Sequence, residues 1–369
     1  MVMTKYIFIS LVVIHALIHL LGFIKAIRPN SLPLLSQRVS KLAGILWLST
    51  TVIMLWAIVI YVFGYDYWWI FGAIGLLLSQ TLIIRSWKDS KFGTFANLLL
   101  LLALIIGFSN WDFNQMVGRE SVTILSDASK ENLMVTEQML EPLPPVVQNW
   151  LRKTECIGKP IINDVHIRQT GEMLLKPGTS WNLFSAEQWV TVYPQAFLWK
   201  TRVTGPMHIL LKGRDKYQDG QGNMLIKFLA TFPLVDARGP EINQAAMLRY
   251  LSEIVWYPTA ALSDYIEWHQ IDDFSAKATI HNGNMIDSGV FHFNKEGLVT
   301  SFKTKRYYYR KGQSTLETWV ADIDDKSFFK FDGILVPRKA KITWKLKQGD
   351  FTWFRLELTD LKYNVHGNR

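Results

Sequence analysis

Two histidines have a type and spacing that could do chemistry. His15 and His19 lie four residues apart in an apolar stretch, so a helix would place both on one face. Imidazole is the commonest metal ligand, and inside a membrane it needs a partner within the protein. Three interpretations stay open: interhelical hydrogen bonding, a haem or metal site, and proton or quinone chemistry. Polar residues at similar predicted depth in the other apolar stretches are Thr50 or Thr51, Gln80 and Asn97.

The aromatic residues of the second part of the chain form another candidate group. Tyr250, Trp256 and Tyr257 belong to a predicted helical stretch, residues 239–258, and we expect them to line any ligand site. The other tryptophans of this part either fill a core or leave an apolar groove, and both alternatives stay open. The nine tryptophans concerned are Trp150, Trp181, Trp189, Trp199, Trp256, Trp268, Trp319, Trp344 and Trp353.

Charged residues in the same region have simpler interpretations. Arg249 and Glu253 are four apart on the predicted helix, and we expect an exposed ion pair. The run from Lys303 to Lys311 alternates basic and aromatic residues, as a single-strand nucleic-acid platform would. On the outer side of a membrane we favour instead a solvated strand or a sheet face over anionic lipid. The acidic group at residues 322–325 is expected to be a solvated turn.

Signatures of catalysis are missing from the sequence. It contains no Gly-x-Ser-x-Gly, no His-Glu-x-x-His, no phosphate-binding loop and no Gly-x-Gly-x-x-Gly. One cysteine excludes a disulfide framework or a cysteine-rich zinc module. We therefore favour a protein that is not an enzyme and that carries no cofactor, with haem or metal at the histidine pair as the alternative.

Four apolar runs are the elements that position the histidines. Each is long enough to cross about 30 Å of hydrocarbon, which takes about 20 helical residues. The first is too long for the core of a signal peptide and has no convincing cleavage site, so we interpret it as a retained anchor. The runs are Tyr6 to Ile27, Leu42 to Phe63, Tyr67 to Trp87 and Phe92 to Asn110.

The charge of the chain reports topology. The formal net charge is +9, and residues 1–110 contribute +6 of it, from eight basic and two acidic residues. The positive-inside rule then places the first and third connections in the cytoplasm, and both the N-terminus and the C-terminal domain outside it. We expect a bacterial plasma (inner) membrane location and no nucleic-acid partner. The basic residues of these connections are Lys25, Arg28, Arg38, Lys41, Arg85, Lys88 and Lys91.

Beyond the apolar runs, the pattern changes twice. Residues 111–160 are expected to form a tether with two short helices, from Ser129 to Leu140 and from Pro145 to Cys156. Residues 161–369 show a period of two with turn signals between the runs, which predicts ten or eleven antiparallel strands. The stretch 239–258 interrupts them with an amphipathic helix. The predicted fold class is a four-helix membrane bundle, residues 1–110, followed by a curved antiparallel sheet or half-barrel with one inserted helix.

Three motifs carry a resemblance. His15-Ala-Leu-Ile-His-Leu-Leu-Gly-Phe, Arg249-Tyr-Leu-x-Glu-x-x-Trp-Tyr-Pro-Thr-Ala and Phe331-Asp-Gly-Ile-Leu-Val-Pro-Arg resemble a family of uncharacterised bacterial four-span membrane proteins with an extracytoplasmic β domain. The run from Asp332 to Trp344 is more weakly similar to the lipoprotein-carrier superfamily. That second resemblance implies a half-barrel around a helical plug that binds acyl chains. This chain departs from it by being fused to four spans.

Three functions follow as hypotheses. The first is a membrane-anchored envelope protein whose β domain binds lipid or another apolar ligand, with membrane lipid as its partner. The second is a membrane haem or metal redox protein that uses His15 and His19. The third is an envelope scaffold whose sheet docks another envelope protein.

Overall fold

The computed structural model describes residues 2–32, 35–205, 210–310 and 313–365. The chain divides into two compact units. One comprises Met1–Gln115 with Leu229–Thr231, and the other comprises Met116–Phe228 with Phe232–Arg369. We call them the helical unit and the β domain, and we describe each by itself.

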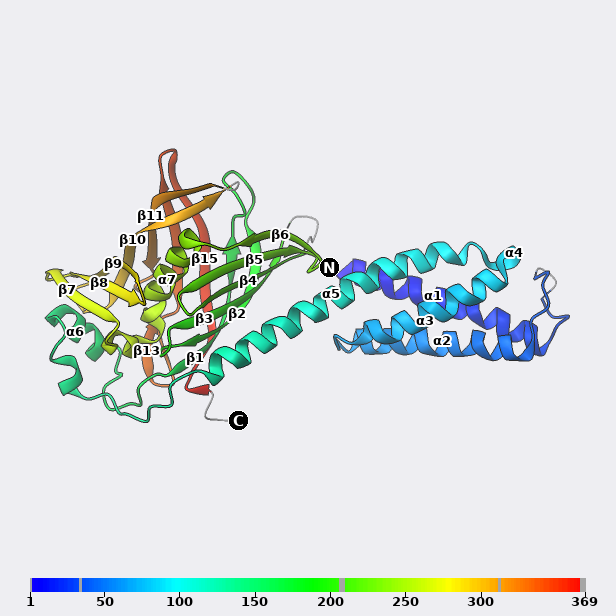
Figure 1. Cartoon of the computed structure of the whole chain (residues 1–369), viewed down its shortest axis with the longest axis horizontal. Coiled ribbons are helices and arrows are strands. Elements are labelled where there is room, and N and C mark those ends of the chain that lie inside the picture. Colours follow the sequence, from blue (N-terminus) through cyan, green and yellow to red (C-terminus); the bar gives the residue numbers. More distant parts are fainter. Residues whose placement is uncertain (1, 33–34, 206–209, 311–312, 366–369) are drawn as a thin grey trace. The chain divides into compact units, whose positions relative to one another are not determined.

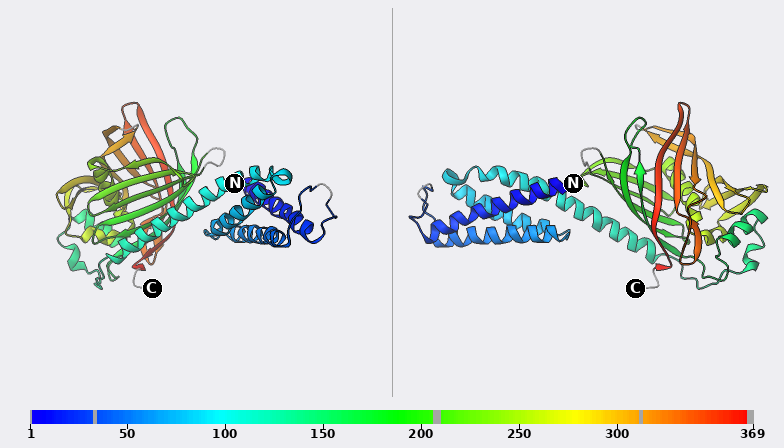
Figure 2. Two further views of the ribbon diagram at one scale, coloured as in Figure 1. Left: turned by 45° about the vertical axis from the view of Figure 1, so that its right-hand side comes forward. Right: turned by 180° about the vertical axis from the view of Figure 1, so that it is seen from behind.

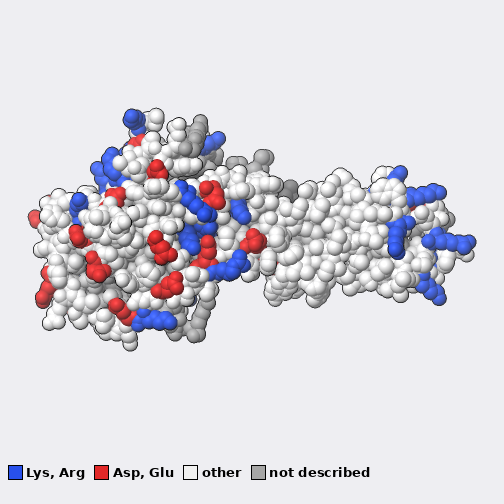
Figure 3. Space-filling view, in the orientation of Figure 1, with Lys and Arg blue, Asp and Glu red and all other residues white. Residues whose placement is uncertain are grey.

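The helical unit contains four helices long and apolar enough to cross a membrane, as the sequence predicts. They are α1 (Val2–Ile27), α2 (Lys41–Val62), α3 (Trp68–Arg85) and α5 (Gly93–Ser126), with the short α4 (Trp87–Ser90) before the last. Residues 116–126 of α5 already belong to the β domain. The α1–α2 connection meets α4 through Asp89, which accepts hydrogen bonds from Ser36 Oγ (2.7 Å) and the Gln37 backbone N–H (2.9 Å). On the face shown in Figure 3, Lys and Arg gather at one end of this unit and its sides carry no charge.

Helix α5 is longer than the apolar run that predicts it. The run ends at Asn110, whereas the helix continues to Ser126. Phe113, Val117 and Ile124 are buried along this extension at helical spacing. The polar residues between them lower the mean hydropathy, so a search for apolar spans stops early although the amphipathic helix continues.

The β domain is built on one antiparallel sheet of thirteen strands that curls into a half-barrel (Figures 1 and 2). The predicted fold class is therefore confirmed. The strand order is β6-β5-β4-β3-β2-β1-β15-β14-β11-β10-β9-β8-β7. The first group of strands comprises β1 (Asp164–Met173), β2 (Asn182–Thr191), β3 (Ala196–Thr204), β4 (Leu210–Gln218), β5 (Gln221–Phe228) and β6 (Phe232–Ala237). The second comprises β7 (Ile266–Asp272), β8 (Ser275–Asn282), β9 (Met285–Phe293), β10 (Val299–Arg310), β11 (Gln313–Ile323), β14 (Lys339–Leu346) and β15 (Gly349–Tyr363).

The sheet has more strands than the ten or eleven expected. The edge strands β6 and β7 were the ones missed, because Phe-Pro-Leu-Val-Asp-Ala and Ile-Glu-Trp-His-Gln-Ile-Asp lack a clean alternation. The hairpin β12 (Phe328–Phe331) and β13 (Ile334–Pro337) forms a separate two-stranded sheet. Its turn places Asp332 and Gly333 at positive φ, which suits the Asp-Gly pair of the Phe331-Asp-Gly-Ile motif.

Helical elements accompany the sheet. The inserted helix α7 (Pro240–Glu253) starts at a proline, and two 3₁₀ turns follow it, η3 (Ile254–Trp256) and η4 (Pro258–Leu262). It packs closely on β5, where a Cβ on Gly222 would lie 2.6 Å from the Ile242 carbonyl oxygen. Of the two short helices expected in the tether, α6 (Pro145–Lys153) forms, and only the turn η1 (Glu137–Leu140) remains of the other.

Two side-chain hydrogen bonds tie distant parts of the curled sheet together. Asn282 Nδ2, at the end of β8, donates to the Tyr217 hydroxyl of β4 at 2.9 Å. Gln195 Nε2, beside β3, donates to the His281 carbonyl at 2.9 Å. The strands involved stand near opposite ends of the strand order, so the sheet must curl strongly to bring them together.

Candidate functional site

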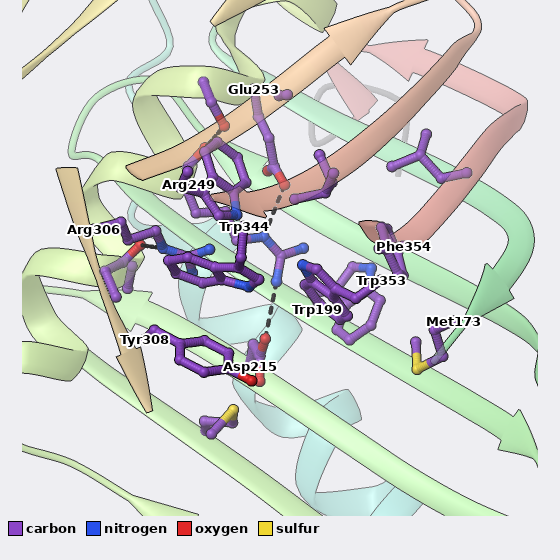
Figure 4. A pocket seen from close by; sticks show the side chains of 18 of the residues that line it. Met173, Trp199, Asp215, Arg249, Glu253, Arg306, Tyr308, Trp344, Trp353 and Phe354 are labelled. Atoms are coloured by element: carbon purple, nitrogen blue, oxygen red, sulfur yellow. Dashed lines mark hydrogen bonds and ion pairs between the residues drawn. The ribbon is translucent and has the colours of Figure 1, made fainter. Parts of the chain in front are cut away.

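A cavity of about 390 Å³ lies between α7 and the concave face of the sheet (Figure 4). Its size falls within the range of small-molecule sites, about 300–1,000 Å³. Aromatic side chains make up much of its wall. Of the nine tryptophans that could either fill a core or line a groove, five line this cavity. These are Trp199, Trp256, Trp319, Trp344 and Trp353.

Strand pairing explains how the wall is assembled. On β11 and β14, alternate residues point to one face of the sheet, as strand geometry requires. Trp319 stands directly opposite Trp344, Ala321 opposite Ile342, and Ile323 opposite Ala340, and all six line the cavity. The small Ala321 and Ala340 leave space between the larger side chains.

Other tryptophans belong to solid packing. Trp150 of α6 is buried against Phe291 and Phe293, with ring centroids 6.1 Å away in each case. Trp268 lies 5.3 Å from Phe291. The β domain therefore holds both a packed aromatic core and an aromatic cavity.

One side of the cavity carries a buried ionic cluster around Arg249. Its Nε donates to Glu253 Oε1 at 2.8 Å and its Nη1 to Asp215 Oδ2 at 2.9 Å, while Nη2 lies 3.3 Å from Gln188 Oε1. Gln188 Nε2 in turn donates to Glu253 Oε2 at 2.5 Å. The expected exposed ion pair is thus wrong in its location. The spacing of four is right, but this face of α7 is turned into the curl, where Asp215 of β4 joins the pair.

Aromatic rings hold the same guanidinium. Arg249 lies 4.9 Å from the ring of Phe197 and 4.8 Å from that of Trp199, both on β3. Burial lowers the pKa of Arg249, but the ion pairs with Glu253 and Asp215 raise it more, so the guanidinium stays protonated. A positive charge flanked by aromatic faces and carboxylates is a stable part of the cavity wall.

A second arginine, Arg306 of β10, faces the cavity in a similar aromatic setting. Its guanidinium lies 5.1 Å from the ring of Trp319 and 5.8 Å from that of Trp344, and its Nε donates to the Ala245 carbonyl at 2.8 Å. The expectation of a solvated basic strand holds for Lys303 and Lys305, which are exposed. It is wrong for Arg306, because alternation along β10 turns this residue inward.

The electrostatics of the two arginines differ. Burial, together with the like charge of Arg249, lowers the pKa of Arg306 to about 10. Among the described residues, no carboxylate lies within the ion-pair distance of 4.0 Å from Arg306, whereas Arg249 has two. The residues that line the cavity carry four basic and two acidic side chains, an excess of two positive charges. They are Lys176, Lys216, Arg249, Arg306, Asp215 and Glu253.

The three predicted ligand-binding residues lie in different places. Trp256 lines the cavity, and its Nε1 donates to the Pro337 carbonyl at 3.1 Å. Tyr250 and Tyr257 are fully buried and are not part of the cavity wall. The Tyr257 hydroxyl donates to the Tyr250 carbonyl at 3.0 Å, and the Tyr250 hydroxyl lies 2.9 Å from that of Tyr265.

Asp215, like Arg306, is a site residue that the sequence did not identify. It lies in Lys-Gly-Arg-Asp-Lys-Tyr, which has the charge density of an exposed strand. Strand alternation could have identified it. If one face of β4 is solvated, the aromatic ring of Tyr217 belongs on the buried face, and every second residue before it lies on that same face. This alternation places Asp215 and Gly213 on the inner face with Tyr217.

The histidine pair lies in the helical unit, and both side chains are buried, with three of their four ring nitrogens in hydrogen bonds to the protein. His15 Nε2 lies 2.8 Å from Asn97 Oδ1 of α5, and His19 Nε2 lies 2.8 Å from Ser79 Oγ of α3. His19 Nδ1 lies 2.7 Å from the His15 carbonyl oxygen, so this nitrogen carries a proton. With a neutral His19 ring, Ser79 Oγ–H donates to His19 Nε2, and His15 Nε2–H donates to Asn97 Oδ1.

The hydrogen-bond network of the histidine pair includes some of the polar residues that the sequence places at a similar depth, and also Ser79, which was not among them. Asn97 Nδ2 donates to Gln80 Oε1 at 3.0 Å, so both predicted residues join the network. Thr51 donates instead to the Ala16 carbonyl of α1 at 2.9 Å. Within the part of the chain that the structure describes, no group of three or more His, Cys, Asp or Glu side chains is placed to hold a metal ion. A metal or haem at His15 and His19 stays a prediction.

Fold and site together define a class of protein: a curled antiparallel half-barrel with a helix inside it and an aromatic cavity, preceded by four apolar helices. The chain belongs to the Family of unknown function (DUF6544), whose model matches residues 133–356, more than half of its length. A comparison with curated proteins finds no match. The matched residues include Arg249, Arg306 and the five cavity tryptophans, and they lie after the apolar helices.

Proposed function

We propose that the β domain binds a lipid or another apolar ligand in its cavity, and that the apolar helices hold the domain at a membrane. The observation that carries this proposal is the space between α7 and the sheet, kept open where larger side chains at Ala321 and Ala340 would fill it. A solid core would leave no such volume in a domain that elsewhere packs its aromatics tightly.

The orientation is part of the proposal. Seven basic residues lie in or beside the α1–α2 connection and the segment around α4, so these face the cytoplasm by the positive-inside rule. The β domain would then lie on the outer side of a bacterial plasma membrane. An apolar cavity at that position is suited to ligands that partition into the bilayer.

The weak resemblance of the sequence of residues 332–344 to the lipoprotein-carrier superfamily favours the same ligand class. That similarity implies a half-barrel that shelters acyl chains around a helical element. Fusion to four apolar helices argues for binding at the membrane surface rather than for release of a carrier.

Purification of the full chain in a mild detergent tests the proposal. Mass spectrometry of extracted lipid should find near-stoichiometric lipid with the native protein. Ala321→Trp, which fills the cavity, should lose most of it. Leu316→Trp is the matched control, because Leu316 is exposed, is on the same strand and does not line the cavity. Native protein without lipid, or a folded Ala321→Trp variant that retains it in full, would overturn the proposal.

A further inference from the structure

Arg249 and Arg306 occupy matching environments with different partners. Each guanidinium lies within 6 Å of two aromatic rings, and each lines the same cavity. Arg249 is satisfied by Asp215, Glu253 and Gln188. Arg306 uses its Nε for the Ala245 carbonyl, and its two Nη nitrogens have no hydrogen bond to a described residue. The fork formed by these two nitrogens is free to bind something else.

Arg306 is half-buried, and a cation withdrawn from water without a counter-ion is costly for a protein to keep. Glu253 and Asp215 cannot supply the missing partner at short range, because their carboxylates already bind Arg249. The surroundings also favour an incoming negative charge, since the basic residues that line the cavity outnumber the acidic ones by two. Planar carboxylate and phosphate groups match a guanidinium fork with two parallel hydrogen bonds.

From this contrast we propose that the ligand is an amphiphile, an alkyl or acyl chain that bears a carboxylate or phosphate group, and that its anionic group binds the Nη fork of Arg306. The inference rests on the proposed function and specifies the chemical class of its ligand. The chain lies along the wall of Trp319, Trp344 and Trp353, where apolar contact provides affinity. Arg306 provides selection for an anionic end group over a neutral or cationic one.

The test uses the full chain in lipid nanodiscs, with protein-free nanodiscs subtracted for partition. Four probes share one chain length: decanoate, decyl phosphate, decanol and decyltrimethylammonium. Binding is followed by calorimetry or by quenching of tryptophan fluorescence. Decanoate or decyl phosphate should bind at least about tenfold more tightly than decanol, with the cation weakest, as a charge-assisted hydrogen-bonded pair requires. The stronger of the two anions identifies the head group.

Three variants link the preference to Arg306. Arg306→Gln should bring the affinity for the anions down to that for decanol, and Arg306→Lys should retain part of the preference. Lys305→Gln removes one charge from the exposed face of the same strand and should leave it unchanged. If Arg306→Gln does not fold, the order of affinity for the four probes, measured with native protein and with Arg306→Lys, still shows whether an anionic end group is selected.

The outcomes separate the two proposals. Decanol equal to decanoate in native protein overturns the anionic amphiphile and leaves apolar binding standing. No binding of any alkyl probe overturns both. Acetate or inorganic phosphate binding as tightly as the alkylated anions would reduce the site to a simple anion site and would also overturn the inference.

Discussion

The Asp215 carboxylate and the Arg249 guanidinium, 2.9 Å apart, connect strand β4 to helix α7 across 34 residues of chain. Through this pair and the adjoining Glu253, the inserted helix is fixed to the sheet by charge as well as by packing. The cavity lies beside this connection, so its shape depends on where the pair holds α7. The stability of the domain should therefore be sensitive to either partner.

Arg249→Met should destabilise the β domain by about 3–5 kcal/mol, because it leaves the buried Glu253 carboxylate and the half-buried Asp215 carboxylate without a cation. Denaturant unfolding of the full chain in detergent, followed by tryptophan fluorescence, measures this free energy. Arg168→Met is the control, since Arg168 is 59% exposed and lies 3.9 Å and 4.0 Å from its acidic partners. It should cost at most about 1 kcal/mol. Equal effects of the two substitutions would show that the cluster adds nothing to stability.

Substitutions at the predicted ligand-binding residues should separate stability from binding. Tyr257→Phe removes the hydroxyl that donates to the Tyr250 carbonyl and should cost about 1–3 kcal/mol of unfolding free energy. Affinity for an alkyl probe should stay within about twofold, because Tyr257 is not part of the cavity wall. Trp256→Ala should instead change that affinity. A Tyr257→Phe protein of native stability with weakened binding would contradict this division.

Stability should fall steeply in alkali. Burial raises the pKa of Tyr250 and Tyr257 well above its usual value, and raises the pKa of Tyr265 to about 12. In the unfolded chain these hydroxyls ionise near pH 10. Their contribution is therefore complete below pH 10 and is lost as the pH rises toward the folded values. Within that pH window, each tyrosine lowers the free energy of unfolding by about 1.4 kcal/mol per pH unit.

Tyrosinate absorbance against pH, recorded together with circular dichroism, measures this effect. The buried Tyr250, Tyr257 and Tyr265 should ionise only as the structure is lost. Tyr265→Phe should make stability fall less steeply with pH. Ionisation of every tyrosine near pH 10 in a protein that stays folded would be the opposite result.

Asn97 should be the central residue of the polar network in the helical unit. Asn97→Leu removes its hydrogen bonds to His15, Ser79 and Gln80, each worth about 0.6–2 kcal/mol inside a membrane. Thermal denaturation of the detergent-solubilised chain should show a clearly lower melting temperature for the Asn97→Leu variant. Thr81→Leu is the control, because Thr81 is exposed and bonds only its own helix, through the Leu77 carbonyl.

The haem or metal alternative is tested on the same purified protein. A Soret band or stoichiometric metal that disappears in a His15→Ala, His19→Ala double variant would establish it. We expect neither, because three of the four ring nitrogens already have hydrogen-bond partners in the protein.

Much of the fold could be predicted because its signals are local. Hydropathy alone marks the four apolar helices, and the period of two marks most strands. The inserted helix is signalled by Pro240 and its apolar stripe. Edge strands such as β6 lack alternation, since an edge is packed less regularly than the middle of a sheet, and so they were not predicted.

The candidate site was harder, because its contacts join residues far apart in sequence. Spacing pairs Arg249 with Glu253, but nothing local shows that the pair faces inward or that Asp215 completes it. Arg306 is one basic residue in a run of them, and only the register of β10 distinguishes it from its exposed neighbours. Tyr250 and Trp256 lie on one helical stretch, yet the cavity reaches only the second of them.

The two hydrogen bonds that join β8 to β4 and to Gln195 bear on how wide a ligand the proposed binding site would accept. In a closed barrel, strand number and stagger fix the radius, because every strand is laddered to two neighbours. Here β6 and β7 end the strand order, and side chains rather than a backbone ladder hold the curl together. A change in the width of the half-barrel would therefore require these side-chain bonds to be exchanged, but it would break no strand pairing. For the proposed amphiphilic ligands, such a frame would accommodate chains of different thickness, and discrimination would depend on the chemistry of their end group.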